Sequence, residues 1–363
     1  MKIDALNHWI PNFNSELPLV IAGPCSAESE EQVLTTAHAL KNNPALKVFR
    51  AGVWKPRTRP NNFEGLGEIA LPWLAKVKKE TGLLTTTEVA TAKHVEACLK
   101  AGIDILWIGA RTTANPFSVQ EIADALKGVD IPVMIKNPIN ADLQLWIGAL
   151  ERLNLAGITK LIAIHRGFSV ADKLEFRNAP LWKIPMELKA KYPELPLLCD
   201  PSHITGNRDL VQSVCQKAID LDMNGLIVET HPNPEKAWSD ASQQVTPDML
   251  RTIINSLLLK SEASGDKSFN EKLHSYRGQI DRLDNELIHI LKLRQQVVEK
   301  IALEKTSQNV TALQKSRFEE MIKDRTDTAL KFGLEQNFIK ELFTSIHEQS
   351  VQVQTDIFNK NKD

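Results

Sequence analysis

The sequence predicts an α/β fold, a (β/α)8 barrel, followed by a smaller all-α domain of three helices. Three observations lead to this prediction. The chain has 363 residues, eight short apolar runs alternate with helical stretches in its first two thirds, and proline is absent after residue 270. Because a single core rarely grows beyond about 250–300 residues, a chain of this length is expected to hold two domains.

The eight apolar runs are continuous rather than alternating, which is typical of parallel strands that are buried on both faces. They cover residues 19–26, 46–52, 83–89, 105–111, 132–137, 161–167, 197–203 and 225–231. Eight β/α units in about 245 residues match the usual size of a (β/α)8 barrel. A doubly wound open sheet is the alternative. The count of eight and the polar cluster after nearly every run favour the barrel.

The composition changes after the eighth unit. A polar stretch rich in small side chains predicts a linker. The expected domains are the barrel at 1–260, the linker at 261–269 and the helical domain at 270–363. Apolar residues then recur at helical spacing, at Ile280, Leu283, Leu287 and Leu291. The three helices are expected at roughly 270–306, 312–331 and 335–360, and Gly333 is expected in the second turn.

Charge and composition argue against several classes of protein. Hydrophobic residues make up 42% and charged residues 25%, and the net charge of −1 provides no global basic field for nucleic acid or an anionic membrane. No apolar stretch approaches the roughly 20 residues that span a bilayer, and the first residues do not resemble a signal peptide. The four cysteines show no paired motif, so we expect a reduced cytoplasmic protein.

Cationic side chains follow several of the expected strands, and in a barrel these carboxyl ends face the active site. The cations are Arg50, Lys55, Arg57, Arg111, Lys136 and Arg166. Their mutual repulsion is costly unless anions lie between them, and arginine binds phosphate and carboxylate through paired hydrogen bonds. The pattern therefore predicts substrates with several negative charges. The alternative is that each cation pairs with a neighbouring carboxylate on the surface.

A second set at the strand ends combines one thiol, one imidazole and two carboxylates. Its members are Cys25, His203, Glu229 and Asp240. Mixed sulfur, nitrogen and oxygen ligands suit a divalent transition ion such as manganese, iron, cobalt or zinc. The four residues are scattered along the chain, so their spacing alone does not establish a metal site. Cys25 as a structural core residue and His203 as a hydrogen-bonding residue remain the alternatives.

Seven short strings occur in one order along the barrel: GPCS, KPRT, GARTT, KN, HRG, DPSH and VETH. Over residues 18–260 the chain therefore resembles the 3-deoxy-D-arabino-heptulosonate 7-phosphate (DAHP) synthase family of TIM barrels, in its compact, metal-dependent class. The resemblance implies condensation of phosphoenolpyruvate with erythrose 4-phosphate. A Schiff-base aldolase that uses Lys136 is one rival. A 3-deoxy-D-manno-octulosonate 8-phosphate synthase is another, but that family has a different string in place of KPRT.

The resemblance also implies roles for the residues named above. The divalent metal, manganese before iron, cobalt or zinc, would be bound by Cys25, His203, Glu229 and Asp240. Phosphoenolpyruvate would be held by Arg50, Lys55, Arg111, Lys136 and Arg166. Erythrose 4-phosphate would be oriented by Lys55, Arg57 and Thr58. Proton transfer would involve Lys55 or His203, and the residues do not decide between them.

In the helical domain, Arg294 and Lys305 are eleven residues apart and lie about 20° apart around a helix, on one face. Arg277 lies about 100° from that face, so it is expected to point elsewhere. Ser350 and Gln354 are i,i+4 neighbours on the last helix. The alternative is that all of these are solvated residues on amphipathic helices.

This set resembles the all-helical chorismate mutases, which rearrange chorismate to prephenate. The residues on that pattern are Arg277, Asp284, Arg294, Lys305, Arg317, Ser350 and Gln354. The resemblance implies an interlocked homodimer in which Arg277 reaches the other subunit's site. It implies that arginines bind the two carboxylates while Lys305 and Gln354 stabilise the breaking ether oxygen. Gln314 and Phe318 depart from the pattern, so a module that binds prephenate or chorismate with little mutase activity is the alternative. In either case, feedback inhibition of the barrel through the helical domain is expected.

Overall fold

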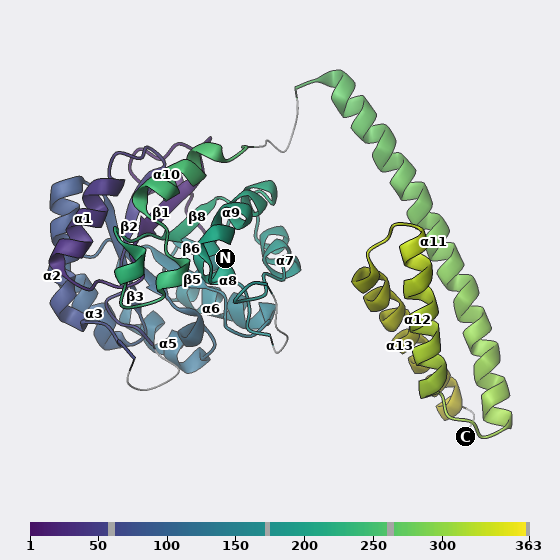
Figure 1. Ribbon diagram of the computed structural model, residues 1–363. Coiled ribbons are helices and arrows are strands. Elements are labelled where there is room, and N and C mark those ends of the chain that lie inside the picture. The colour runs from purple at the N-terminus through teal and green to yellow at the C-terminus, as the bar shows by residue number, and fades with distance from the viewer. Residues whose placement is uncertain (57–61, 171–174, 260–264, 361–363) are drawn as a thin grey trace. The chain divides into compact units, whose positions relative to one another are not determined.

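The structure is a computed structural model that describes residues 1–56, 62–170, 175–259 and 265–360 (Figure 1). Its contacts divide the chain into two units, Met1–Glu262 and Ala263–Asp363. Arg57, Thr58 and the first part of the predicted linker lie outside the described residues. Among the described residues, no helix combines the length and the apolar character that a membrane span requires.

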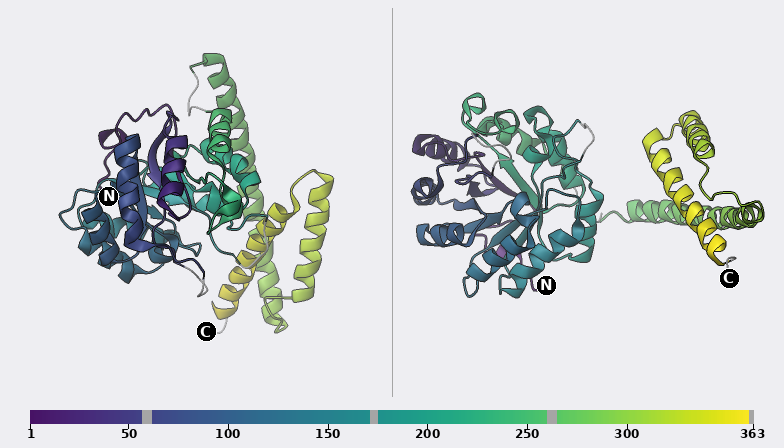
Figure 2. Two further views of the ribbon diagram at one scale, coloured as in Figure 1. Left: turned by 60° about the vertical axis from the view of Figure 1, so that its left-hand side comes forward. Right: turned by 90° about the horizontal axis from the view of Figure 1, so that it is seen from below.

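The first unit is a closed barrel of eight parallel strands in chain order, with helices around the outside (Figures 1 and 2). The strands are β1 (Leu19–Gly23), β2 (Leu46–Arg50), β3 (Leu84–Val89), β4 (Ile105–Ile108), β5 (Val133–Lys136), β6 (Leu161–His165), β7 (Leu197–Cys199) and β8 (Gly225–Glu229). All eight predicted strands are present. Pairing of β1 with β8 closes the sheet, so the doubly wound alternative is wrong.

The helices of this unit follow the strands, as the β/α alternation predicted. They are α1 (Glu30–Leu40), α2 (Leu71–Thr81), α3 (Ala92–Ala101), α4 (Ala110–Thr113), α5 (Pro116–Ala125), α6 (Leu143–Leu155), α7 (Lys183–Lys191), α8 (Pro201–Thr205), α9 (Val211–Asp220) and α10 (Pro247–Ser256). The short helices α4 and α8 directly follow β4 and β7. They therefore begin at the rim of the barrel, where an active site of this fold lies.

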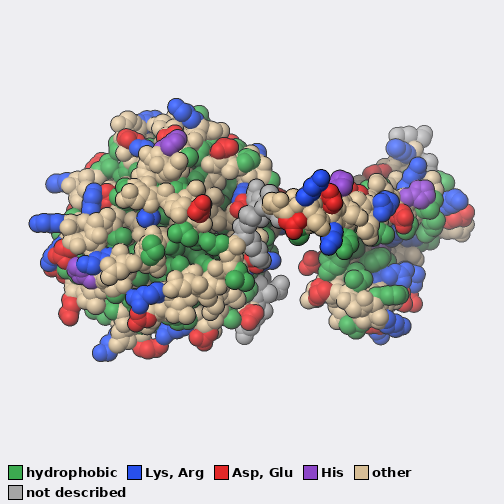
Figure 3. All heavy atoms as spheres, turned by 90° about the horizontal axis from the view of Figure 1, so that it is seen from above, with side chains coloured by type: hydrophobic (Ala, Val, Ile, Leu, Met, Phe, Trp, Pro, Cys, Tyr) green, Lys and Arg blue, Asp and Glu red, His purple; other side chains and the backbone are tan. Residues whose placement is uncertain are grey.

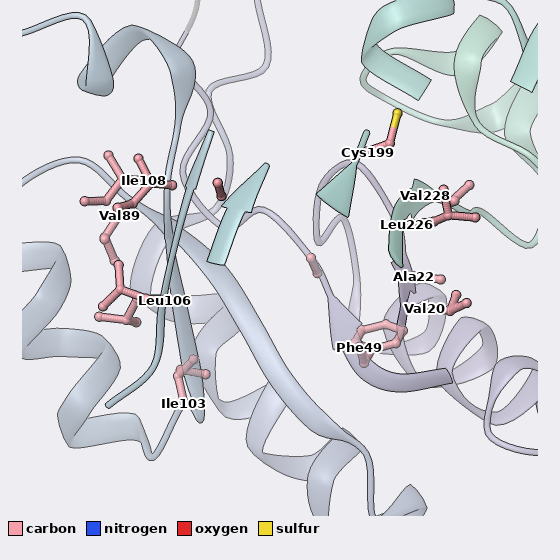
Figure 4. Packing of buried hydrophobic residues seen from close by; sticks show 14 of the residues in the cluster. Val20, Ala22, Phe49, Val89, Ile103, Leu106, Ile108, Cys199, Leu226 and Val228 are labelled. Carbon is pink, nitrogen blue, oxygen red and sulfur yellow. The ribbon is translucent and has the colours of Figure 1, made fainter. Parts of the chain in front are cut away.

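Side chains on each strand alternate between two buried layers. Val20 and Ala22 of β1 point outward into the large cluster between strands and helices, part of which Figure 4 shows. Leu19 and Ile21 point inward and pack with side chains from other strands in the centre of the barrel. Burial on both faces explains why these strands are continuous apolar runs in the sequence.

The second unit consists of α11 (Lys267–Ser307), α12 (Lys315–Lys331) and α13 (Gln336–Lys360), which confirms the three predicted helices. Helix α13 packs against both α11 and α12, and the N-terminal half of α11 extends beyond them (Figure 1). Asp266 caps α11 by accepting a hydrogen bond from the Phe269 amide, so the helix begins slightly earlier than predicted. Gly333 has a φ of 70°, as the turn between α12 and α13 requires.

Candidate active site

A cavity of about 320 Å³ opens at the carboxyl ends of the barrel strands. Its lining residues end or follow strands β2 to β8: Lys55, Pro56, Asn62, Glu88, Gly109, Ala110, Arg111, Lys136, Arg166, Arg177, His203 and Asp240. Four of the predicted cations and two of the predicted metal ligands are among them. Residues that are far apart in the sequence therefore meet at one rim of the barrel.

The buried cations of this site have specific partners. Lys136 Nζ lies 2.7 Å from Asp200 Oδ2, and Arg166 Nη1 donates to Asn178 Oδ1 at 2.8 Å. Burial lowers the pKa of Arg166 to about 10, and the nearby guanidinium groups of Arg177 and Arg111 act in the same direction. Crowding of like charges at this rim stabilises a bound anion. The alternative of isolated surface ion pairs does not describe Lys136 or Arg166.

Arg50 is fully buried beneath this rim. Its guanidinium carbon lies 4.8 Å from the centre of the Trp107 ring, and its Nη2 lies 3.2 Å from Glu229 Oε1. Nε and Nη1 of Arg50 have no hydrogen-bond partner among the described residues. Because unpaired buried donors are costly, these two nitrogens are suited to an anionic ligand.

Cys25 lies between β1 and the rim, next to Lys55. Lys55 Nζ lies 2.9 Å from Cys25 Sγ and donates to the Cys25 carbonyl at 3.1 Å. Gly23 makes this arrangement possible, because it has a φ of 148° and a Cβ there would lie 2.1 Å from the Arg50 carbonyl oxygen. The chain can therefore pass close to β2 and place the thiol beside the lysine.

Three of the four predicted metal ligands form a compact group. Ligand atoms of Cys25, Glu229 and Asp240 all lie within 4.8 Å of one another, and Cys25 Sγ lies 3.3 Å from Asp240 Oδ2. His203 is outside this group of three, but its Nε2 lies 3.8 Å from Glu229 Oε1. Glu229 Oε1 is buried and accepts no hydrogen bond among the described residues. A buried carboxylate oxygen that accepts no hydrogen bond and lies beside a thiol and an imidazole fits a divalent transition ion, with the Arg50 guanidinium 3.2 Å away as its ion-pair partner.

Asp200 holds His203 in place. Its Oδ1 accepts a hydrogen bond from the His203 amide at the start of α8, and its Oδ2 lies 2.9 Å from His203 Nδ1. Burial acts to raise the pKa of Asp200, but His203 and Lys136 outweigh it and hold this pKa well below the usual range. The other ring nitrogen of His203 is thereby directed toward Glu229, as is usual for a histidine that ligates a metal.

The pKa of the Cys25 thiol is shifted in the opposite direction from that of Asp200. Burial raises the pKa of the Cys25 thiol to about 12, and the Glu229 carboxylate acts in the same direction. A cation bound at this point would reverse that balance, because a coordinating thiol loses its proton. The group of ligands therefore fits a divalent ion, and a thiol with a raised pKa is poorly suited to act as a free nucleophile.

Several residues of the site were not selected from the sequence. Glu88 lies at the end of β3 and accepts a hydrogen bond from Trp107 Nε1 at 3.0 Å. Arg177 donates to Asp240 Oδ1 at 3.1 Å. Asp200 and Glu88 stand at strand ends, and that position was the available indication of a role. Arg177 stands at no strand end, so its sequence position gave no indication.

The helical unit has its own cavity, of about 520 Å³, between α11 and α13. Arg294 and Ser350 both line it, and Arg294 Nη1 donates to Ser350 Oγ at 2.5 Å. Gln354 lies one turn further along α13 and donates to the Ser350 carbonyl at 3.2 Å. Its Oε1 is buried without a partner among the described residues. The structure thus brings together three of the seven predicted residues.

The remaining predicted residues of this unit have other neighbours. Lys305 Nζ donates to the Ala312 carbonyl at 2.7 Å, in the turn between α11 and α12. Arg317 is exposed and pairs with Glu320 at 2.7 Å. Arg277 and Asp284 are exposed on α11 and do not line the cavity.

Phe318, which departs from the mutase pattern, packs its ring 4.7 Å from the ring of His347 on α13. Burial lowers the pKa of His347, and the charges of Arg294 and Lys305 act in the same direction. An aromatic pair thus occupies the place where the pattern has a glutamate. Gln314 stands at the N-cap of α12, where its side chain makes no capping hydrogen bond.

Comparison with known proteins assigns a family to each unit. The model of the DAHP synthetase I family matches residues 13–263. The chain belongs to this family. The model of chorismate mutase type II matches residues 276–355, so a DAHP synthase domain and a chorismate mutase domain are both present, consistent with the two enzyme activities. Both domains have roles in the shikimate pathway, and DAHP synthases generally depend on a metal.

Individual relatives match the barrel. The phospho-2-dehydro-3-deoxyheptonate aldolase of Thermotoga maritima is 33% identical over 248 residues, which is 68% of this chain and 71% of that protein. A crystal structure of the Thermotoga maritima DAHP synthase has a TM-score of 0.62 at 30% identity and covers 70% of this chain and 72% of that one. The 2-dehydro-3-deoxyphosphooctonate aldolase of Variovorax paradoxus is 27% identical over 278 residues, which is 69% of this chain and 93% of that protein.

Proposed function

We propose that the barrel of this DAHP synthase family member condenses phosphoenolpyruvate with erythrose 4-phosphate and water to give DAHP and inorganic phosphate. The observation that carries this proposal is the gathering of cations at one cavity, beside a thiol and two carboxylates. The cations are Lys55, Arg111, Lys136 and Arg166 in the lining of the cavity, with Arg50 buried beneath the rim. Two phosphorylated substrates, one of which also carries a carboxylate, supply the anions that such a rim requires.

The residues at the rim have different roles in this reaction, which follow from their positions. Arg111, Lys136 and Arg166 bind the phosphate and carboxylate of phosphoenolpyruvate, and positioning matters because its C3 carbon is a weak nucleophile. Lys55 lies beside Cys25 and can give a proton to the oxygen that develops from the aldehyde. A divalent ion, manganese in the first place, would be held by Cys25, His203, Glu229 and Asp240 and would polarise the aldehyde carbonyl as a Lewis acid.

Release of phosphate from phosphoenolpyruvate plus erythrose 4-phosphate tests this proposal. We expect turnover that stops with EDTA and returns when Mn²⁺ is added in excess. Arabinose 5-phosphate in place of erythrose 4-phosphate is the matched substrate control and should give no turnover. Turnover with arabinose 5-phosphate alone would favour the octulosonate synthase, and turnover that EDTA does not affect would favour a Schiff-base aldolase.

We propose further that the helical unit catalyses the rearrangement of chorismate to prephenate. Arg294, which lines the cavity with Ser350, would bind a substrate carboxylate, and Gln354 would donate to the ether oxygen in the transition state. Arg294→Ala should abolish mutase turnover, so that the absorbance of chorismate no longer falls, while the circular dichroism spectrum of the protein stays unchanged. Ser345→Ala changes an exposed residue of the same cavity and should retain turnover. Equal rates for both variants would contradict the site.

We infer that the helical unit forms a homodimer. Apolar side chains that repeat every seven residues along α11 are exposed in the single chain: Ile280, Leu283, Leu287, Ile290, Val297 and Ile301. Figure 3 shows apolar surface on this unit. A second copy that packs along this stripe would bury it, which at about 25 cal/mol per Å² is a strong driving force. Sedimentation equilibrium should give a dimer, and Leu287→Arg should shift it toward the monomer.

Feedback inhibition of the barrel by prephenate or chorismate is a further proposal, which the fusion of both domains in one chain supports. Saturating prephenate should reduce the rate of DAHP formation in the full chain. An unchanged rate would exclude this regulation. The departures from the mutase pattern at Phe318 and Gln314 support a second candidate function, in which the helical unit binds these ligands with little mutase turnover of its own.

We also infer a reducing compartment such as the cytoplasm. All four cysteines are buried and unpaired, which is typical of proteins that work in that compartment. Labelling with a thiol reagent under denaturing conditions, without prior reduction, should therefore modify four cysteines per chain.

A further inference from the structure

Gln243 connects the two carboxylates of the proposed metal site. Its side chain is fully buried in the loop between β8 and α10, and its Nε2 donates to Glu229 Oε2 at 2.7 Å. Its Oε1 accepts a hydrogen bond from Arg177 Nη1 at 2.8 Å. The same Arg177 nitrogen donates to Asp240 Oδ1 at 3.1 Å. An amide and a guanidinium thus form a continuous link from one carboxylate to the other.

The orientation of the Gln243 amide follows from its partners. A carboxylate can only accept and a guanidinium can only donate, so the NH2 group must face Glu229 and the carbonyl must face Arg177. A reversed amide would place two acceptors together on one side and two donors together on the other. The link between Glu229 and Arg177 therefore has one favourable arrangement, and this restricts the rotation of both side chains.

The link leaves a defined oxygen of each carboxylate for a ligand. On Glu229, Oε2 is held by Gln243, whereas Oε1 accepts no hydrogen bond among the described residues and has the Arg50 guanidinium 3.2 Å away. On Asp240, Oδ1 is held by Arg177, whereas Oδ2 faces Cys25 Sγ at 3.3 Å. Glu229 Oε1 and Asp240 Oδ2 are therefore the two oxygens that this link leaves for an ion.

We propose that Gln243, together with Arg177, is a positioning residue that presents Glu229 Oε1 and Asp240 Oδ2 to the divalent ion and thereby sets its affinity. This inference rests on the proposed metal site. Groups that hydrogen-bond to ligating carboxylates fix their orientation, and their loss typically weakens metal binding about 10- to 100-fold. Gln243 is fully buried and does not line the cavity, so it acts on the reaction through the metal, whereas Arg177 lines the cavity as well.

The structure also offers a matched control for the integrity of the loop. Arg208 holds the same loop, because its Nε and Nη2 donate to the carbonyls of Ser242 and Ala241. Among the described residues, its side-chain hydrogen bonds and ion pair go to Ser242, Ala241 and Glu235 and not to Glu229, Asp240 or Gln243. Arg208→Met therefore removes these two hydrogen bonds and the ion pair of Arg208 with Glu235 in the same loop, and leaves the link between the carboxylates intact.

The experiment titrates metal-free, full-length protein with Mn²⁺ and measures the free ion by its electron paramagnetic resonance signal. Gln243→Leu and Arg177→Met should each weaken Mn²⁺ binding about 10- to 100-fold. The wild-type chain and Arg208→Met should bind alike. With Mn²⁺ in large excess, the kcat of Gln243→Leu for phosphate release should return toward that of the wild-type chain, since the residues that line the cavity remain.

The outcomes separate this inference from the proposed metal site. If the wild-type chain binds Mn²⁺ and Gln243→Leu binds it equally well, the inference fails and the metal site stands. If Arg208→Met weakens binding as much as Gln243→Leu, the integrity of the loop sets the affinity and the inference also fails. If the wild-type chain does not bind Mn²⁺, both fail. Gln243→Glu, which keeps the side-chain volume, and Arg177→Met provide the test if Gln243→Leu does not fold.

Discussion

Gly109 directly faces the carboxylate of Glu88: a Cβ at position 109 would lie 2.1 Å from Glu88 Oε1. Glycine 109 precedes α4 with a φ of −74°, so the space beside Glu88, and not the backbone conformation, requires the missing side chain. Glu88 is held from the other side by the indole N–H of Trp107 at 3.0 Å. The carboxylate is thus fixed in the wall of the cavity between two neighbouring strands.

Gly109→Ala should therefore displace Glu88 into the cavity. A shift of about 1 Å in a positioning group can cost about 100-fold in rate, so kcat/KM for phosphate release should fall by that order. Gly148→Ala is the matched control, because nothing lies within 4 Å of a Cβ there. That change, inside α6, should retain activity and raise the free energy of unfolding by about 0.5–1 kcal/mol. Unchanged kcat/KM in Gly109→Ala would contradict the tight contact.

The buried ion pair of Lys136 and Asp200 should contribute strongly to stability. Removing one partner of a buried pair leaves an uncompensated charge, so Lys136→Met should lower the free energy of unfolding by about 3 kcal/mol. Lys160→Met is the control, because Lys160 pairs with the exposed Asp130. This substitution should lower the free energy of unfolding by less than about 1 kcal/mol. Urea unfolding can be followed by tryptophan fluorescence, since all seven tryptophans lie in the barrel unit. Equal losses would argue against the special role of the buried pair.

His165 should make the barrel less stable at acidic pH. Burial lowers the pKa of this fully buried side chain to about 3, and Arg166 acts in the same direction. An unfolded chain takes up the proton near pH 6.5, so below that pH the unfolded state binds more protons than the folded one. Stability is therefore complete above pH 6.5 and falls by about 1.4 kcal/mol per pH unit as the pH drops toward 3.

The test compares the wild-type chain with His165→Leu between pH 6.5 and pH 5.5. Other titrating groups contribute to both proteins, so the difference between the two pH dependences isolates the imidazole. Between pH 6.5 and pH 5.5, the free energy of unfolding of the wild-type chain should fall by about 1 kcal/mol more than that of His165→Leu. Parallel curves would mean that the pKa of His165 in the folded protein is close to its value in the unfolded chain.

Much of the barrel could be predicted from the sequence, because burial on both faces produces runs such as 161–167 that need no knowledge of the partner strand. Lys136, Arg166 and His203 could be placed at one rim for the same reason, since every parallel strand ends there. The hydrogen-bond partners could not be predicted. Gln243 meets Glu229 and Arg177 through a loop in which Asp240 has a φ of 47°, and no spacing rule describes that conformation.

The helical unit shows a similar division. Helical spacing correctly placed its three helices, but α12 begins later than predicted, at Lys315. Asn309 has a φ of 53°, and the Val310 amide donates to the Lys305 carbonyl. These residues form the turn after α11. Whether Arg277 enters a partner's site depends on a second copy of the chain, which periodicity on one helix does not describe.

Mixing two inactive variants tests that dimer and the role of Arg277 together. Arg277 is exposed on α11 and does not line the cavity of its own chain, where Arg294 contacts Ser350. If Arg277 acts across subunits, Arg277→Ala and Arg294→Ala should each be inactive as mutases. A heterodimer of the two variants contains one site with both arginines intact and one site with neither. Random reassociation should therefore restore about a quarter of the wild-type sites.

The control for this mixture is the doubly substituted chain, Arg277→Ala with Arg294→Ala, combined with either single variant, which should restore no activity. Denaturing and refolding the two chains together, then measuring chorismate loss, gives the readout. Activity that stays at zero in the mixture of single variants would mean that both arginines act within one chain or that the chains do not exchange. Mass spectrometry of the intact dimer under native conditions distinguishes these two cases, because the heterodimer differs from each homodimer once one variant carries a heavy-isotope label.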